Sequence, residues 1–416
     1  MSGPAINSAG IYVSIPFCRS KCTYCNFASG VYPASEHERY VERLVADLRG
    51  ARGWAESVGA ELPRRVDTVY LGGGTPSLLA PELLTKLFGA IRGEFDVDAD
   101  AEITMECAPG QLEDATLRAM AACGVNRVSL GVQSLVDAEA RGSGRLHDRA
   151  TVERDIKRLR AAGIGNINVD LIAGLAGQTL ASWEESLTAL VDAGVPHASV
   201  YMLEVDEDSR LGRELLAGGA RYGAGLVPND EAIAQMYERA CERLGEAGLA
   251  QYEISNFARA GAESKHNLRY WRREPYLGVG LDASSMLRAG EDVVRSTTVG
   301  DLREYLDGAA PVEVVALSPD RQHEEAWFLG LRLNAGVEVA AVDAEFGTER
   351  VSAAMDTAWQ LAQDGLLEAV DGRVRLTAQG RLLSNEVFAE FLEDVALVAD
   401  TGELPSGAEA PQIDRT

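Results

Sequence analysis

The sequence lacks any apolar run long enough to cross a membrane. Hydrophobic residues make up 46% of the 416 positions, but no uninterrupted stretch approaches the roughly 20 residues that a transmembrane helix needs. The first residues also lack the charged start, apolar run and cleavage site of a secretory signal. We therefore expect a globular protein of the cytoplasm, long enough for two or three domains.

Basic residues are scarce relative to acidic ones. The chain has 39 Lys and Arg against 64 Asp and Glu, which gives a formal net charge of -25. Such a surface repels the phosphates of nucleic acids and the headgroups of anionic membranes. Neither is therefore expected as a main partner.

Cysteine is too scarce for a disulfide-stabilised fold. Of the six cysteines, Cys18, Cys22 and Cys25 fall within eight residues. In a reducing compartment such a cluster indicates a metal site more often than a disulfide. The cysteines at positions 107, 123 and 241 lie in apolar or helical surroundings, so they are predicted to be core residues.

Short β-rich runs alternate with amphipathic helical stretches over the first half of the chain. The expected strands are 11–17, 66–74, 101–107, 125–134, 166–174 and 197–205. The expected helices between them are 38–50, 81–93, 112–124, 150–163 and 180–194. This alternation predicts βαβ units and a parallel sheet, which is either doubly wound or curved into a partial barrel.

Unusual residues stand where these strands end. The three cysteines follow the first strand, and "GGGTP" ends the second. Glycines and polar residues at this and later strand ends are Gly73, Gly74, Thr75, Glu106, Gln133 and Asp170, joined by Arg145 in "SGRLHD". In either architecture ligands bind beyond the carboxyl ends of the strands, so we predict one site there.

Three kinds of site compete for the clustered cysteines. Zinc commonly takes four ligands in two separated pairs, but no second pair exists and the nearest histidine, His37, stands near an expected helix start. A redox CxxC pair at Cys22–Cys25 leaves Cys18 idle. An iron–sulfur cubane held by three thiolates leaves one iron open for a ligand. The residues favour the cluster, with zinc as the main alternative.

The second half of the chain is less regular. A helix at 229–248 leads into an aromatic- and Gly-rich segment, and a helix-rich block begins near residue 318. Asp371-Gly372 predicts a hairpin before a final helix, as in a winged-helix module. We divide the chain into a core at 1–240, a connecting segment at 241–310, a C-terminal domain at 311–397 and a disordered tail at 398–416.

The cysteine spacing CxxxCxYC after a first strand resembles the radical S-adenosylmethionine (SAM) superfamily. "YVSIPFCRSKCTYCNF", "YLGGGTPSLL", "GVNRVSLGVQS", "NINVDLIAGLAGQT", "YEISNFA" and "HNLRYW" narrow the resemblance to the oxygen-independent coproporphyrinogen III oxidase-like family, over residues 10–395. The resemblance implies an α/β fold: a partial (β/α)6 TIM-like barrel and a smaller C-terminal α+β domain like a winged helix.

Two features separate the branches of this family. The decarboxylating oxidases extend the motif to CxxxCxxCxC, whereas Phe27 stands at the last position here. The heme chaperone branch, HemW, carries HNxxYW, which is present from His266 to Trp271. The resemblance thus implies a chaperone that binds heme and transfers it to acceptor proteins, without oxidase activity. The alternative function is radical decarboxylation of coproporphyrinogen III.

The resemblance also implies cofactors and the residues that hold them. Cys18, Cys22 and Cys25 would hold a [4Fe-4S] cluster whose open iron binds SAM. The residues expected around SAM are Tyr12, Tyr24, Gly73, Gly74, Thr75, Glu106, Gln133, Arg145 and Asp170. His266 is the expected heme contact. The implied partners are a heme acceptor and an electron donor such as a flavodoxin-type reductant, with membrane contact only through the acceptor.

The sequence departs from the family pattern at two positions. Ala176 stands in "GLAGQT" where relatives usually place Pro, which implies a minor loop change. Ser284 stands in "GLDASSM" where relatives commonly show histidine. Any role of that histidine in heme or substrate contact is therefore missing here.

Overall fold

The computed structural model describes residues 8–308, 311 and 313–392. The predicted disordered tail, 398–416, lies outside the described residues. Among the helices that are described, none combines the length and apolar character needed to cross a membrane.

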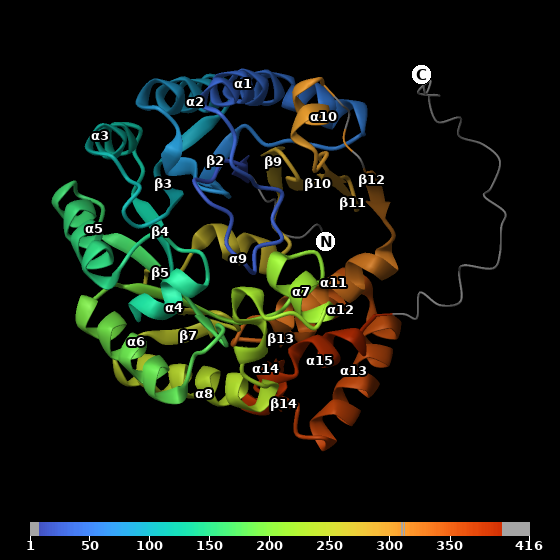
Figure 1. Ribbon diagram of the computed structural model, residues 1–416. Coiled ribbons are helices and arrows are strands. Elements are labelled where there is room, and N and C mark those ends of the chain that lie inside the picture. The colour runs from blue at the N-terminus through green and yellow to red at the C-terminus, as the bar shows by residue number, and fades with distance from the viewer. Residues whose placement is uncertain (1–7, 309–310, 312, 393–416) are drawn as a thin grey trace.

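The first six strands form a parallel sheet in chain order. They are β1 (Ala9–Ile15), β2 (Arg65–Gly73), β3 (Asp96–Cys107), β4 (Arg127–Gln133), β5 (Asn166–Ala173) and β6 (His197–Met202). Each pairs in parallel with the next. A doubly wound sheet reverses its strand order at a switch point, so the uninterrupted order identifies the partial barrel (Figure 1).

Helices cover the outer side of this sheet. The α-helices that alternate with the strands along the chain, or follow β6, are α1 (Ala34–Ser57), α2 (Pro81–Glu94), α3 (Asp114–Ala122), α4 (Asp137–Gly142), α5 (Arg149–Ala161), α6 (Leu180–Ala193), α7 (Arg210–Leu216) and α8 (Asp230–Glu246). Two 3-10 turns, η1 (Pro76–Leu78) and η2 (Arg221–Leu226), precede α2 and α8. In Figure 1 the longer ones form an arc around the strands. The five expected helices are all present, and the short α4 and α7 are additional.

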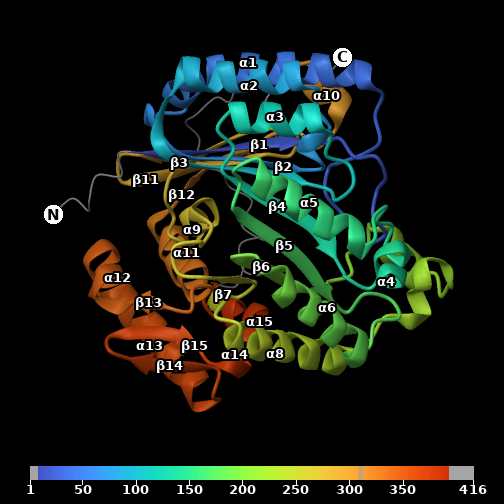
Figure 2. The ribbon, with the colours of Figure 1, turned by 90° about the vertical axis from the view of Figure 1, so that its left-hand side faces the viewer.

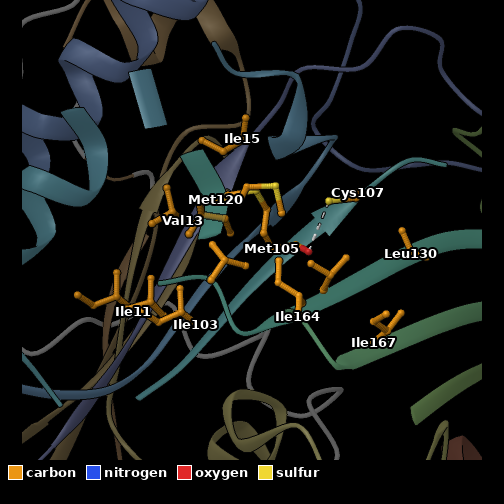
Figure 3. Packing of buried hydrophobic residues seen from close by; sticks show 14 of the residues in the cluster. Ile11, Val13, Ile15, Ile103, Met105, Cys107, Met120, Leu130, Ile164 and Ile167 are labelled. Atoms are coloured by element: carbon orange, nitrogen blue, oxygen red, sulfur yellow. Dashed lines mark hydrogen bonds between the residues drawn. The ribbon is translucent and has the colours of Figure 1, made fainter. Parts of the chain in front are cut away.

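The two faces of each strand differ in polarity because side chains alternate along a strand. On β4, Val128, Leu130 and Val132 are buried in the core beneath the helices, whereas Ser129 and Gln133 face the inside of the barrel. Figure 3 shows the apolar side chains of β1, β3 and β4 in this core, with Met120 from α3 among them. The apolar face fixes the helices, and the polar face is free to build a site.

Further strands extend both edges of the barrel sheet. Beside β1 lies the parallel strand β9 (Tyr276–Gly280), followed by the antiparallel strands β10 (Ser284–Ala289), β11 (Asp292–Thr297) and β12 (Glu313–Leu317). Beside β6 lie the antiparallel strands β8 (Asn256–Ala258) and β7 (Ala250–Glu253). Along the chain, α9 (Lys265–Trp271) follows β8, and α10 (Leu302–Leu306) lies between β11 and β12. The proposed connecting segment thus supplies strands to both edges.

The C-terminal elements pack around a second apolar cluster centred on Trp327. They are α11 (Pro319–Leu331), β13 (Val337–Glu338), α12 (Val339–Phe346), α13 (Thr348–Gln363), β14 (Leu367–Val370), β15 (Arg373–Leu376), α14 (Ala378–Leu382) and α15 (Ser384–Ala389). The predicted hairpin is confirmed: β14 and β15 pair across Asp371 and Gly372, both with positive φ, as a type I′ turn requires. These elements lie beside α8, opposite α1 and α2 (Figure 2).

Candidate functional site

A cavity of about 1250 Å³ is lined by the inner face of the barrel and opens beyond the strand ends. It is larger than the roughly 300–1,000 Å³ that suits one small ligand. All the predicted site residues line it except Tyr12 and His266. The cavity therefore brings together the cysteine loop, the glycine-rich turn and the polar residues of β3 to β5.

Backbone hydrogen bonds hold the cysteine loop over this cavity. The Cys18 N–H donates to the Gly30 carbonyl at 2.8 Å, and the Thr23 N–H donates to the Ser143 carbonyl at 3.1 Å. The Leu211 N–H donates in turn to the Thr23 carbonyl at 2.8 Å. The three clustered cysteines are all half-buried free thiols. The loop is thus fixed to three neighbouring segments while its thiols face the cavity.

The cysteine environment suits thiolates bound to a cluster. The Arg145 guanidinium donates to the Cys22 Sγ at 3.5 Å and also to the Gly131 carbonyl, so a positive charge lies beside this sulfur. Burial raises the pKa of the Cys18 thiol, although hydrogen bonds from Ser29 and Thr75 oppose that shift.

Among the described residues, no three His, Cys, Asp or Glu side chains converge on one metal ion. In a cubane cluster each thiolate binds its own iron, so its sulfurs need not meet at a point. The donor set fits the cluster: three thiols on one loop, at the wall of a cavity with room for a further ligand.

The glycine-rich turn after β2 lies directly against the strand that leads to the cysteines. The Gly74 N–H donates to the Ile15 carbonyl at 2.8 Å, and the Thr75 N–H donates to the Phe17 carbonyl at 2.7 Å. A Cβ on Gly74 would lie 2.8 Å from the Phe17 carbonyl oxygen and 2.9 Å from the Ile15 carbonyl oxygen. Only glycine fits this close backbone approach, which ties the turn to the cysteine loop.

Two carboxyl groups in the cavity have no ion-pair partner among the described residues. Glu106 accepts a hydrogen bond from the Tyr70 hydroxyl at 2.9 Å, and burial raises its pKa to about 7. Asp170 accepts from Ser129 at 2.9 Å and from Asn168 at 2.7 Å, and burial raises its pKa as well. A cationic ligand would compensate their charge. The sulfonium and ammonium groups of SAM have that charge.

Gln133 has an unusual backbone conformation at the end of β4. Its φ is 71°, in the left-handed region that non-glycine residues rarely occupy, and such strain concentrates at ligand sites. Its buried Oε1 has no hydrogen-bond partner in the part of the chain that the structure describes. This amide oxygen could therefore accept a hydrogen bond from a donor group of a bound ligand.

Three predicted positions differ from expectation: Asp170 was expected at the end of its strand, and Tyr12 and His266 do not line the cavity. Asp170 lies three residues before the end of β5, on its inner face. Tyr12 lies on β1 with its ring 6.1 Å from that of Tyr70. His266 is buried in α9, with Nδ1 2.9 Å from the Thr68 hydroxyl and Nε2 2.8 Å from the Tyr270 hydroxyl.

The position of His266 bears on its predicted role as a heme contact. Burial lowers the pKa of its imidazole to about 3, so the ring is neutral, but both ring nitrogens already have partners. Ligation of heme iron would require the ring to leave Thr68 and Tyr270. Its role therefore stays a prediction.

Sequence reasoning missed several residues that line the cavity. From the barrel they are Arg127, Ser129, Asn168, Ser199 and Asn256, with Asn267 from α9. From the C-terminal elements they are Arg332, Gln379 and residues 382–386. The barrel residues had a signal, because they stand at every second position of strands that otherwise alternate with Val, Leu and Ile. The C-terminal residues had none.

Family comparisons agree with this architecture. A family model described as the radical SAM superfamily matches residues 12–190. A second model, described as the HemN C-terminal domain, matches residues 317–383. The two matches fall on the barrel and on the C-terminal elements, respectively.

Curated relatives match nearly the whole chain. The heme chaperone HemW of Lactococcus lactis is 35% identical over 392 residues, which cover 93% of this chain and 98% of the relative. The chain belongs to the HemW family. A second member, the heme chaperone HemW of Bacillus subtilis, is 34% identical and covers 92% of this chain and 99% of its own length.

The fold of this HemW family member is also that of a solved structure. Coproporphyrinogen III oxidase (HemN) from Escherichia coli, described as a radical SAM enzyme, superimposes with a TM-score of 0.78 over 92% of this chain and 90% of its own. The two share 23% sequence identity, so the likeness concerns the fold alone. It confirms the predicted α/β barrel with a C-terminal domain.

The charge of Glu106 should make SAM binding depend on pH. Because burial raises the pKa of this carboxyl to about 7, most of it is protonated at pH 6 and ionised at pH 8. We expect affinity for SAM to rise by up to roughly tenfold over that range, measured by equilibrium dialysis. Glu106→Gln should remove the dependence, whereas an equally steep dependence in that variant would contradict the assignment.

The raised pKa of Glu106 also makes the stability of the fold depend on pH, but stability falls with rising pH whereas SAM affinity rises. The pKa of Glu106 is about 7 in the folded protein against an ordinary value of 4.5, so the folded state binds more protons between these values. Its contribution to the free energy of unfolding is therefore present at low pH and is lost as the pH rises toward 7.

Proposed function

We propose that this chain is a heme chaperone that binds heme and transfers it to an acceptor protein. The observation that carries the proposal is its relationship to heme chaperones over more than nine-tenths of the length of both chains. A shared barrel would be compatible with many functions, but these relatives share the C-terminal elements and the segment between them as well.

Phe27 supports this proposal over the oxidase alternative. It stands where the oxidase motif has a further cysteine, and its side chain is 63% exposed at the rim of the cavity. It offers flat apolar surface in place of a thiol. The fold shared with coproporphyrinogen III oxidase does not by itself assign that activity to this chain.

Cys18, Cys22 and Cys25 would hold the [4Fe-4S] cluster, and SAM would bind beside it. When bound, the reduced cluster supplies one electron to SAM. Arg145 keeps a positive charge beside Cys22 and suits the SAM carboxylate. Glu106 and Asp170 suit its cationic groups or ribose hydroxyls. The chain positions these groups and limits the access of water; the cofactors supply the difficult chemistry.

The proposal includes a location and partners. We place the protein in the cytoplasm, where a flavodoxin-type protein would supply electrons and an acceptor would take the heme. Membrane contact would occur only through that acceptor. The net charge of -25 makes nucleic acid an improbable partner, since like charges repel.

Heme binding by the protein tests the proposal. We expect the anaerobically reconstituted protein to bind added heme as a saturable complex that survives gel filtration, measured by heme absorbance in the protein fraction. Hen-egg-white lysozyme at equal concentration controls for nonspecific adsorption. Heme that leaves the protein as completely as it leaves the control would contradict the proposal.

A further inference from the structure

The cavity extends deep into the barrel, away from the cysteine loop. It is lined by alternate residues of β4 along the whole strand: Arg127, Ser129, Gly131 and Gln133. Six residues of strand, at about 3.3 Å each, span about 20 Å. Arg127 at the start of β4 therefore marks a deep end well separated from Gln133, which lies near the proposed SAM site.

Arg127 is a buried cation without hydrogen bonds. Its side chain is 2% exposed, and it forms no hydrogen bond with any described residue; its Nε is buried and unpartnered. Among the described residues, the one carboxylate within 4 Å of the guanidinium is that of Glu102, 3.9 Å from Nε; the charge of Arg127 also acts on Asp170. Glu102 already accepts hydrogen bonds from the backbone N–H groups of Lys265 and His266. The guanidinium thus has donors that lack acceptors.

A second guanidinium, on the half-buried Arg332, lines the cavity from the C-terminal side. Arg332 follows α11 and lies over the ring of Trp271, 4.2 Å from its centre. Within the described residues its Nε is buried without a hydrogen-bond partner, and the carboxylate paired with the guanidinium, that of Glu253, is 4.0 Å away.

A row of polar side chains lies on the strands between the two arginines. Asn168 donates to Ser199 at 3.0 Å, and Ser199 donates to Asn256 at 2.8 Å. The deep end is therefore polar, with hydrogen-bonded neutral groups between two cations that lack acceptors. Buried donors without acceptors are costly, and an entering group with acceptor oxygens would satisfy them.

We propose that the deep end of the cavity is a carboxylate subsite, built on Arg127, that binds a propionate group of heme. The inference rests on the proposed function and adds the place and orientation of the ligand. A guanidinium presents paired N–H donors that match the two oxygens of a carboxylate. The porphyrin ring then lies in the cavity between the deep end and Phe27.

This arrangement gives the HNxxYW segment a structural part in the subsite. His266 joins α9 to β2 and β3 through Thr68 and Glu102. Asn267 lines the cavity, and Trp271 supports Arg332. The motif thereby builds the wall around the carboxylate while the ring nitrogens of His266 stay bonded inside the protein.

Two ligands that differ only in their carboxylates test the subsite. Heme and heme dimethyl ester are titrated into wild-type protein, Arg127→Met and the control Arg65→Met, an exposed arginine paired with Asp98 outside the cavity. We expect wild type and the control to bind heme about 10- to 100-fold more tightly than the ester. Arg127→Met should lose that preference while still binding the ester.

The outcomes separate the subsite from the proposed function. Wild-type protein that binds heme and ester equally overturns the subsite and leaves heme binding intact, whereas protein that binds neither contradicts the function itself. Should Arg127→Met not fold, because Glu102 loses its cation, Arg127→Lys keeps the charge and is expected to retain a smaller preference for heme. A preference as large as that of wild type overturns the requirement for the guanidinium.

A second source of the carboxylate is SAM itself. Equilibrium dialysis of SAM with wild type and Arg127→Met distinguishes it. We expect little change in SAM affinity, since Arg127 lies about 20 Å along β4 from Gln133 and acts on Asp170 through its charge alone. A tenfold loss of SAM affinity with unchanged heme binding would assign the subsite to SAM and overturn the proposal.

Discussion

Cys22→Ala is expected to abolish assembly of the iron–sulfur cluster. Cys18, Cys22 and Cys25 are the cysteines of the loop over the cavity, and each would bind one iron of the cubane. Loss of the middle thiolate leaves two irons without protein ligands, and Arg145 loses the sulfur to which it donates at 3.5 Å. Iron and sulfide per chain after anaerobic reconstitution, with the brown absorbance of the cluster, measure the result.

A matched cysteine outside the cavity provides the control. Cys241 on α8 is half-buried beside the core, and burial raises the pKa of its thiol to about 11, so it is a poor metal ligand. Cys241→Ala should keep the full iron content. If Cys22→Ala kept as much iron as Cys241→Ala, the cluster assignment would be wrong.

Gly74→Ala is expected to impair both the cluster and SAM binding. The new methyl group would lie 2.8–2.9 Å from backbone atoms of Ile15, Pro16 and Phe17, which cannot move aside as a flexible side chain could. Such overpacking costs about 1–3 kcal/mol, and it displaces the segment that carries Cys18. We expect at least a tenfold loss of SAM affinity by equilibrium dialysis, together with a lower iron content.

Gly53→Ala is the matched control for that substitution. Gly53 lies within α1, and a Cβ there has no atom within 4 Å. Alanine is favoured over glycine inside a helix by about 0.5–1 kcal/mol, so this variant should bind SAM normally with unchanged or slightly higher stability. Equal SAM affinity in both variants would show that the close approach at Gly74 is dispensable.

The sequence was informative where local pattern determines structure. Alternation of apolar and polar residues predicted the six parallel strands, and the cysteines, glycines and polar residues at their ends predicted the site. Every second residue of β4 already carried the polar face that includes Arg127. The strand pattern did not decide between a doubly wound sheet and a partial barrel, because strand order depends on how distant segments of the chain pair. The family resemblance was needed to choose the barrel.

Long-range packing explains what could not be predicted. Arg332 reaches the cavity because α11 packs beside α9, where Trp271 supports its guanidinium. Leu383 and Asn385 line the same cavity from the C-terminal elements. No spacing within the sequence relates these positions to Cys18. His266 was singled out by its motif, but the bonds to Thr68 and Tyr270 that occupy its ring arise only in the folded protein.

The most direct test of the chaperone function compares two reactions on one anaerobic preparation with its cluster assembled. One sample receives heme, and the other receives coproporphyrinogen III with SAM and a reductant; porphyrins are separated by chromatography. We expect heme to be retained in a saturable complex and coproporphyrinogen III to be recovered unchanged. Efficient formation of protoporphyrinogen IX by a preparation that does not retain heme would contradict the chaperone function.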